Sequence, residues 1–232
     1  MTVQLPLALR YPPDQRFETF VTADAAVASL RALAARDIVV SSNVYVIGPS
    51  GAGKSHLLLA ACAQCETLGR RAAYLPLVSA VGRLHDALQA LDGYDLLALD
   101  GLDAIAGNRE DEVALFDAHN RAHDAGGAML YAAREVPDAL PLTLPDLRSR
   151  LSQCARIVLH PLNDDGRREL LRRRAARRGL QLDDMALEWL LKRVDRDLAS
   201  LTALLDRLDT ASLAAQRRIT VPFLRDTLGT DR

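Results

Sequence analysis

The stretch "NVYVIGPSGAGKSHLLLAAC", residues 43–62, decides the fold of this chain. Its first five residues are mostly branched and apolar, which is typical of a buried strand. The octet Gly48–Ser55 fits the pattern G-x-x-x-x-G-K-[ST] at every position, and a helical pattern follows over 54–68. Glycines let the backbone curl so that successive N–H groups point at phosphate oxygens, while the helix N-terminus adds positive potential. A strand, a glycine loop and a helix in this order predict a phosphate-binding loop.

Two side chains of this loop carry specific chemistry. In loops of this pattern the lysine pairs with the β- and γ-phosphates and the final hydroxyl binds Mg²⁺. Lys54 and Ser55 are therefore the candidate ligands of ADP or ATP and of the metal ion. We expect the nucleotide to lie against the whole loop and the residue after it, namely Gly48, Pro49, Ser50, Gly51, Ala52, Gly53, Lys54, Ser55 and His56.

A second apolar run, "DLLALD" at 95–100, ends on an acid. A buried strand that ends on a carboxylate is where a phosphate-loop protein is expected to carry its magnesium-directing acid. Asp100 is therefore predicted to contact the nucleotide and to bind Mg²⁺. Gly101 follows, at a position where many hydrolytic enzymes carry a second acid that activates the attacking water. Asp103 is a weaker candidate, because three residues further on the chain should point elsewhere.

Composition and charge exclude several classes of protein. The 232 residues are 49% hydrophobic, with 29 basic and 30 acidic side chains and a formal charge of −1. A chain of this length buries a full core, as one large domain or as a large and a small one. The balanced charge gives no overall drive toward nucleic acid or membranes. Apolar runs are far shorter than the roughly 20 residues of a membrane span, and no signal peptide is recognisable. We therefore expect a cytoplasmic protein.

The order of the patterns predicts the domain organisation. Apolar runs alternate with helical stretches, which indicates an α/β fold with a parallel five-stranded sheet, and then give way to consecutive amphipathic helices. We expect an N-terminal arm (1–15), an α/β nucleotide-binding domain (16–161) and a small all-helical subdomain (162–232). The expected strands are 43–47, 72–77, 95–100, 127–133 and 155–160, and the expected helices of the α/β domain are 23–36, 54–68, 79–91 and 110–125.

Three other patterns favour structural roles over chemistry. Cys62 and Cys65 form a C-x-x-C inside a helical stretch, with no second pair to complete a zinc site, so burial in the helix is expected. His119 and His123 have zinc-binding spacing but lack the glutamate of the metalloprotease pattern, so a solvated helix face is favoured. The arginine-rich stretch 167–178 carries an apolar stripe and is interpreted as a solvated helix rather than a nucleic-acid surface.

Together these motifs make the chain resemble the AAA+ ATPases, and among them the DnaA-related replication regulators of the Hda family. The resemblance implies an AAA+ phosphate-loop domain with a parallel five-stranded sheet, followed by a small all-helical lid. Six segments carry it: "FETFV" (17–21), "GPSGAGKSHLL" (48–58), "LDGLDAIAG" (99–107), "LPDLRSRL" (144–151), "LLKRVDRDLASLTALLDRLD" (190–209) and "RRITVPFLRDTL" (217–228).

The resemblance gives roles to two arginines. Arg150 aligns with the arginine finger, which leaves its own subunit to stabilise charge on the γ-phosphate held by a neighbour. Arg196 aligns with the second sensor, which reaches from the lid to the nucleotide of the same chain. Each would otherwise be one of many surface arginines.

The first residues resemble a docking peptide. "QLPLAL" at 4–9 is similar to the extended peptides by which replication proteins bind the DNA polymerase III β sliding clamp, and Pro6 favours an extended chain. The same resemblance implies the DnaA initiator as a partner, contact with DNA only through partners, no membrane partner, and a possible homo-oligomer. The predicted clamp contacts are Gln4, Leu5, Leu7 and Leu9.

Two functions from different classes follow. The first is a nucleotide-bound regulator with weak or no ATPase activity of its own, which docks on the clamp and presents Arg150 to DnaA-bound ATP. The second is a self-sufficient AAA+ ATPase such as a helicase loader. That motor needs a water-activating group which Gly101 does not supply, and Ala133 stands near the usual place of a polar first sensor. A pure adaptor would leave the phosphate loop unexplained. Brisk ATP hydrolysis without partners would favour the loader, and stoichiometrically retained ADP the regulator.

Overall fold

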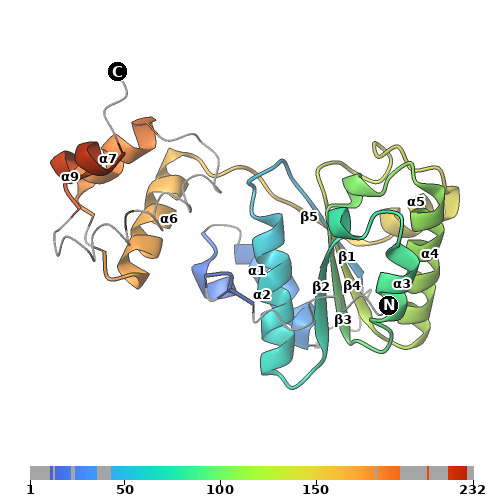
Figure 1. Cartoon of the computed structure of the whole chain (residues 1–232). Coiled ribbons are helices and arrows are strands. Elements are labelled where there is room, and N and C mark those ends of the chain that lie inside the picture. The colour runs from blue at the N-terminus through green and yellow to red at the C-terminus, as the bar shows by residue number, and fades with distance from the viewer. Residues whose placement is uncertain are drawn as a thin grey trace, which may run out of the picture. The chain divides into compact units, whose positions relative to one another are not determined.

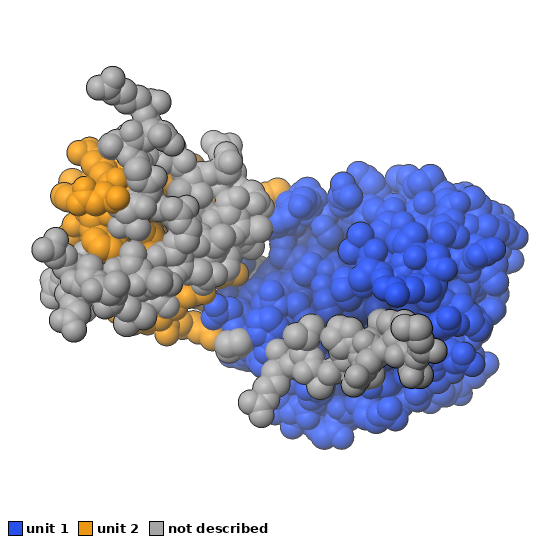
Figure 2. Space-filling view, viewed as in Figure 1, with its two compact units in different colours: residues 1–160 blue, residues 161–232 orange. Residues whose placement is uncertain are grey.

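The computed structural model describes residues 11–12, 14–21, 24–35, 43–180, 182–193, 208 and 219–228. The chain forms two compact units, residues 1–160 and residues 161–232, which are coloured separately in Figure 2. Two of the predicted functional features, the peptide 4–9 and Arg196, lie outside the described residues.

The first unit is built on one sheet whose strand pairs are all parallel. The predicted parallel five-stranded sheet is thereby confirmed, in the order β2-β3-β4-β1-β5. A parallel sheet is covered on both faces, which is why the central strands are nearly continuous apolar runs. The strands are β1 (Asn43–Ile47), β2 (Ala72–Pro76), β3 (Leu96–Asp100), β4 (Ala128–Ala133) and β5 (Ala155–Val158).

Helices cover the two faces of the sheet (Figure 1). On one side lie α1 (Asp24–Ala35) and α2 (Lys54–Thr67), and on the other α3 (Leu84–Gln89), α4 (Arg109–Asp124) and α5 (Pro145–Ser152). Successive strand residues point to opposite faces and therefore enter different cores. The core under α2 includes Val44, Val46, Leu96 and Ala98. The core under α4 includes Tyr45, Ile47, Leu97 and Leu99.

The helix expected over 79–91 is shorter than predicted. A 3-10 helix at Leu77–Ser79 comes first, and α3 begins only at Leu84. The cause lies in another element, because the buried carboxylate of Asp111 on α4 accepts the N–H groups of Gly82 at 2.8 Å and of Leu84 at 3.2 Å. This carboxylate takes the backbone donors of the turn and fixes where α3 starts.

The second unit contains α6 (Asp164–Arg177), α7 (Asp184–Arg193) and α9 (Val221–Leu228). These helices bury a small core of their own that includes Ala175, Leu190 and Leu224. A single parallel bridge between Leu182 and Ile219 is the only strand-like pairing among the described residues of this unit. The predicted α/β domain followed by a small helical subdomain is confirmed. None of the described helices has the length and apolar character needed to cross a membrane.

Candidate nucleotide-binding site

The phosphate loop joins β1 to α2, and its conformation depends on glycine at Gly53. This residue has a φ of +95° and directly precedes α2. A Cβ atom added here would lie 2.7 Å from the ring of Phe20. Glycine accepts both the left-handed backbone and the close ring, whereas any side chain would meet strain from each. The turn brings the loop to the N-terminus of α2, where unpaired helix N–H groups can bind an anion.

The ammonium group of Lys54 lies over the loop. Its Nζ donates hydrogen bonds to the carbonyl oxygens of Gly48 at 2.6 Å and Pro49 at 2.9 Å. Partial burial lowers the pKa of Lys54, although the carboxylates of Asp100 and Asp103 act in the opposite direction. The structure thus holds the lysine at the loop, where the predicted nucleotide phosphates would be its counter-ions.

Ser55, at the start of α2, and Asp100, at the end of β3, are in direct contact. The Ser55 hydroxyl donates to Oδ2 of Asp100, and the Tyr74 hydroxyl donates to the same oxygen at 2.7 Å. The two predicted metal ligands are therefore brought together. Both side chains offer oxygen ligands of the kind that Mg²⁺ prefers. The Ser55 hydroxyl donates its hydrogen bond to the carboxylate, so the lone pairs of its oxygen remain available to a cation. The residues present fit Mg²⁺ beside nucleotide phosphates.

Gly101 follows Asp100 with a φ of +82°. Its N–H donates to the carbonyl of Ala132 at 3.0 Å, which fixes the chain at the end of β3. A Cβ atom placed on Gly101 would have open space within 4 Å, so bulk does not exclude a second acid. The backbone disfavours it, since an L-residue in the left-handed region is strained by about 1–2 kcal/mol.

Two charged residues outside the predicted set, Arg134 and Asp103, affect the pKa of Lys54. Arg134 was not predicted from the sequence, and Asp103 was predicted only as a weaker candidate. Arg134 follows β4 and donates its backbone N–H to the Asp103 carboxylate at 3.1 and 3.3 Å. Asp103 raises the pKa of Lys54 and Arg134 lowers it. Asp103 lies on a new helical turn, as expected, and the 3-10 helix Leu102–Ala104 turns its carboxylate toward the residue that follows β4. Ala133 is the buried last residue of β4. Arg134 could have been found from the sequence as the first polar residue after this apolar run.

The side chain of His56 holds the N-terminal segment against α2. Its Nε2 lies 2.8 Å from the carbonyl oxygen of Arg16 and 3.3 Å from Oγ1 of Thr19. The ring also contacts Phe20 edge-on, with 5.2 Å between centroids. The imidazole therefore has a structural role beside the predicted site.

The predicted arginine finger lies on α5. Leu147 and Leu151, four residues apart, are fully buried on one side of this helix. Arg150 is exposed in the last turn. The helix therefore packs through one face and leaves this guanidinium accessible to another molecule.

Glu112 fixes the start of α5 from the neighbouring helix α4. Its side chain has 0% exposure, and it accepts hydrogen bonds from the N–H groups of Gly107 at 2.7 Å, Thr143 at 2.8 Å and Leu144 at 2.7 Å. The Thr143 hydroxyl donates a further bond at 2.8 Å. Burial alone would raise the pKa of this carboxyl, but the donors from Thr143, Gly107 and Leu144 outweigh it and lower the pKa. One carboxylate thus ties the loop before α4 to the helix that carries Arg150.

The cysteine and histidine pairs have different outcomes. Cys62 and Cys65 are buried in α2, as expected, and burial raises the pKa of the Cys62 thiol. The expected solvated face is wrong for His119, which is buried with Nδ1 2.7 Å from the Tyr131 hydroxyl. Burial lowers the pKa of His119 to about 4, because α4 turns this side chain toward the sheet. His123 is exposed.

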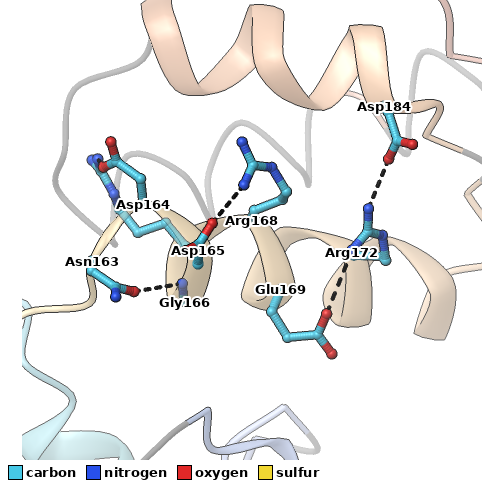
Figure 3. A network of polar contacts seen from close by, with 9 residues as sticks. Asn163, Asp164, Asp165, Gly166, Arg168, Glu169, Arg172 and Asp184 are labelled. Carbon is cyan, nitrogen blue, oxygen red and sulfur yellow. Dashed lines mark hydrogen bonds and ion pairs between the residues drawn. The ribbon is translucent and has the colours of Figure 1, made fainter.

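The arginine-rich stretch forms most of α6, and its charge is largely paired within the second unit (Figure 3). Arg168 contacts Asp165 at 2.8 Å, and Arg172 contacts Asp184 at 2.7 Å and Glu169 at 3.7 Å. The expected apolar stripe is buried, but the expectation that the arginines are solvated is wrong for Arg167 and Arg174, which are buried too. Local ion pairs favour a structural role for these arginines over a nucleic-acid surface.

Comparison with known proteins agrees with this architecture. Residues 164–228 match the family described as "Hda, lid domain". Domain III of the replication initiation protein DnaA from Thermotoga maritima is 20% identical, with a TM-score of 0.79 over 95% of this chain and 98% of that chain. AMPPCP-bound DnaA from Aquifex aeolicus is 19% identical, with a TM-score of 0.72 over 88% and 67%. The RuvB Holliday junction branch migration motor of Thermotoga maritima is 21% identical, with a TM-score of 0.69 over 92% and 71%.

The similarity to solved structures concerns the fold, while the family match concerns the helical unit. Together they agree with an α/β unit that is followed by a helical unit. The chain therefore shares its fold with DnaA domain III, and its residues 164–228 match the Hda lid domain.

Proposed function

We propose that this chain is a negative regulator of replication initiation that promotes hydrolysis of ATP bound to DnaA. One observation carries the proposal. Lys54 lies over the phosphate loop and Ser55 contacts Asp100, which supports a Mg²⁺–nucleotide at this place, yet Gly101 supplies no second acid to activate water. A site of this kind suits a nucleotide that is held, with slow or no turnover of its own. The Hda lid domain directs the proposal to DnaA.

The residues of the first unit have distinct roles in this proposal. The N-terminus of α2 and the Lys54 ammonium bind the phosphates of ADP or ATP. Ser55 and Asp100 hold Mg²⁺, which when bound neutralises part of the phosphate charge. Arg196 has the role of the second sensor in this proposal, as its resemblance to that residue implies. The bound nucleotide then stabilises the conformation in which the regulator meets its partner.

Arg150 acts on the partner rather than on the chain's own nucleotide. A guanidinium placed at the γ-phosphate of DnaA-bound ATP stabilises the negative charge of the transition state, and an exposed arginine in the last turn of a helix is free to reach it. The product is ADP-bound DnaA, which suppresses re-initiation. The proposed setting is the bacterial cytoplasm.

The peptide 4–9 brings the regulator to the sliding clamp, and through the clamp to DNA. In this part of the proposal the leucines fill an apolar pocket and the glutamine adds polar contacts, as in other extended-peptide docking. The direct test is hydrolysis of ATP pre-bound to DnaA, measured with and without the chain and with and without clamp-loaded DNA. Stimulation that requires both the chain and the loaded clamp supports the proposal. No stimulation under any of these conditions would overturn it.

Changing the docking peptide should remove the dependence on the clamp. Replacing Gln4 and Leu7 by alanine should weaken binding to immobilised clamp by more than roughly 30-fold, since a single anchor residue of an interface is typically worth about 2 kcal/mol and two are removed. The matched control replaces Thr2 and Val3, which precede the peptide, and should bind as the unchanged chain does. Equal clamp binding by both variants would place the docking site elsewhere.

Replacing Lys54 by alanine should weaken nucleotide binding by roughly 10- to 100-fold. The variant loses charge-assisted hydrogen bonds to phosphate, which are worth about 1.5–3 kcal/mol. Equilibrium binding of a fluorescent ADP analogue measures the effect, with Lys192→Ala, an exposed lysine of α7, as the control. If Lys54→Ala bound no nucleotide and still stimulated DnaA fully, the chain would be a pure adaptor.

A further inference from the structure

Tyr74 lies on β2, in a position that the parallel register makes specific. It pairs with Ala98 on β3, and Asp100 is two residues further along the same strand. Side chains two residues apart share a face of the sheet, so Ala98 and Asp100 point to the side on which α2 packs. Tyr74 packs against the hydrophobic core on that side of the sheet, and this core includes Ala98 and Leu58. A long phenol on β2 can therefore reach along the face to the carboxylate at the end of β3.

The contact is an oriented hydrogen bond. A phenol facing an ionised carboxylate can only donate, and the Tyr74 hydroxyl does so to Oδ2 of Asp100 at 2.7 Å. Ser55 donates to the same oxygen from the start of α2. Two donors from two different elements thus converge on one oxygen, while Oδ1 takes part in neither bond. This arrangement fixes the rotation of the carboxylate relative to the phosphate loop.

We propose that Tyr74 is a positioning residue for the Mg²⁺ of the nucleotide site, because it holds Asp100 in the orientation in which the carboxylate and the Ser55 hydroxyl act together. The inference rests on the proposed nucleotide site and adds to it a residue outside the phosphate loop and its acid. Groups that orient metal ligands in this way are typically worth about 10- to 100-fold in metal affinity. Tyr74 acts through Asp100.

The test is Tyr74→Phe in the full chain, with a fluorescent ADP analogue as the probe and Mg²⁺ varied from EDTA to saturation. The variant keeps the ring in the core and removes only the hydroxyl. The Mg²⁺ concentration for half-maximal tightening of ADP binding should rise roughly ten-fold. The affinity for ADP in EDTA should stay within about two-fold, because the phosphate loop is untouched. Tyr45→Phe is the control, since the Tyr45 hydroxyl donates to the backbone carbonyl of Glu135.

A second measurement separates positioning from a general effect on the fold. In an Asp100→Asn background, Tyr74→Phe should cause little further change in the Mg²⁺ requirement, because the group it orients is gone. An unchanged Mg²⁺ requirement in Tyr74→Phe overturns the inference, and so does an equal loss of ADP affinity in EDTA. If the unchanged chain binds Mg²⁺–ADP but fails to stimulate DnaA, the proposed function alone fails. If the unchanged chain binds no nucleotide, both fail.

Discussion

Arg150→Ala should abolish the stimulation of DnaA-bound ATP hydrolysis. An arginine finger supplied in trans is typically worth about 10³- to 10⁵-fold in kcat, so the rate should fall close to that of DnaA without the regulator. The variant should fold normally, because Arg150 is exposed while Leu147 and Leu151 anchor α5 in the core. Single-turnover hydrolysis of ATP pre-bound to DnaA, with clamp-loaded DNA present, measures the effect.

The control and a conservative variant make this result specific. Arg121 is also an exposed arginine in the last turn of a helix, and Arg121→Ala should stimulate as the unchanged chain does. Arg150→Lys keeps the charge and loses the planar fork that binds two phosphate oxygens, so it should give an intermediate rate. Full stimulation by Arg150→Ala would show that the finger is another residue. Loss of clamp or nucleotide binding in the same variant would show that Arg150 acts before hydrolysis.

The fold could be predicted because its signals are local. Each central strand is an apolar run of about the expected length, and the glycine loop between β1 and α2 leaves little choice of conformation. The order of strands and helices then implied a parallel sheet. The error in α3 has a tertiary cause, since its start is set by the Asp111 carboxylate on α4. Asp111 lies 27 residues after Leu84, so the local sequence around residue 84 does not reveal this contact.

The candidate site was predictable only where a motif encodes it. Lys54, Ser55 and Asp100 belong to patterns of fixed chemistry, and the structure brings the last two into contact. Tyr74 was missed because it meets Asp100 across 26 residues of sequence, through a strand register that no spacing rule reveals. His119 was misjudged for a related reason, since helical periodicity does not say how much of α4 the sheet covers.

Glu112 shows how strongly such a distant contact can matter, and its removal should have the largest effect on stability. Glu112→Ala leaves the N–H group of Leu144 buried without its acceptor and removes the acceptor of the partly buried N–H groups of Thr143 and Gly107. A buried unsatisfied group costs about 1–3 kcal/mol, and each lost hydrogen bond to a charged group adds to that cost. We expect a loss of about 3–5 kcal/mol in the free energy of unfolding of the first unit. All five tyrosines lie in that unit and the single tryptophan, Trp189, in the other, so urea unfolding followed by tyrosine and tryptophan fluorescence reports the two units separately.

The pH dependence distinguishes the charge of Glu112 from its bulk. Its pKa in the folded chain lies below the ordinary value of 4.5, so its contribution is present in full above that value and is lost as the pH falls through the folded pKa. Glu112→Gln keeps the shape but places an amide donor against N–H donors. It should therefore be less stable than the unchanged chain at pH 7, by a margin that shrinks in urea titrations below about pH 4.5.

The control is Glu110→Gln, at an exposed residue in the same turn of α4, which should stay within about 0.5 kcal/mol of the unchanged chain. If the margin between Glu112→Gln and the unchanged chain were independent of pH, the carboxylate charge would not be what holds α5. If the tryptophan transition shifted while the tyrosine transition did not, the effect would lie in the wrong unit.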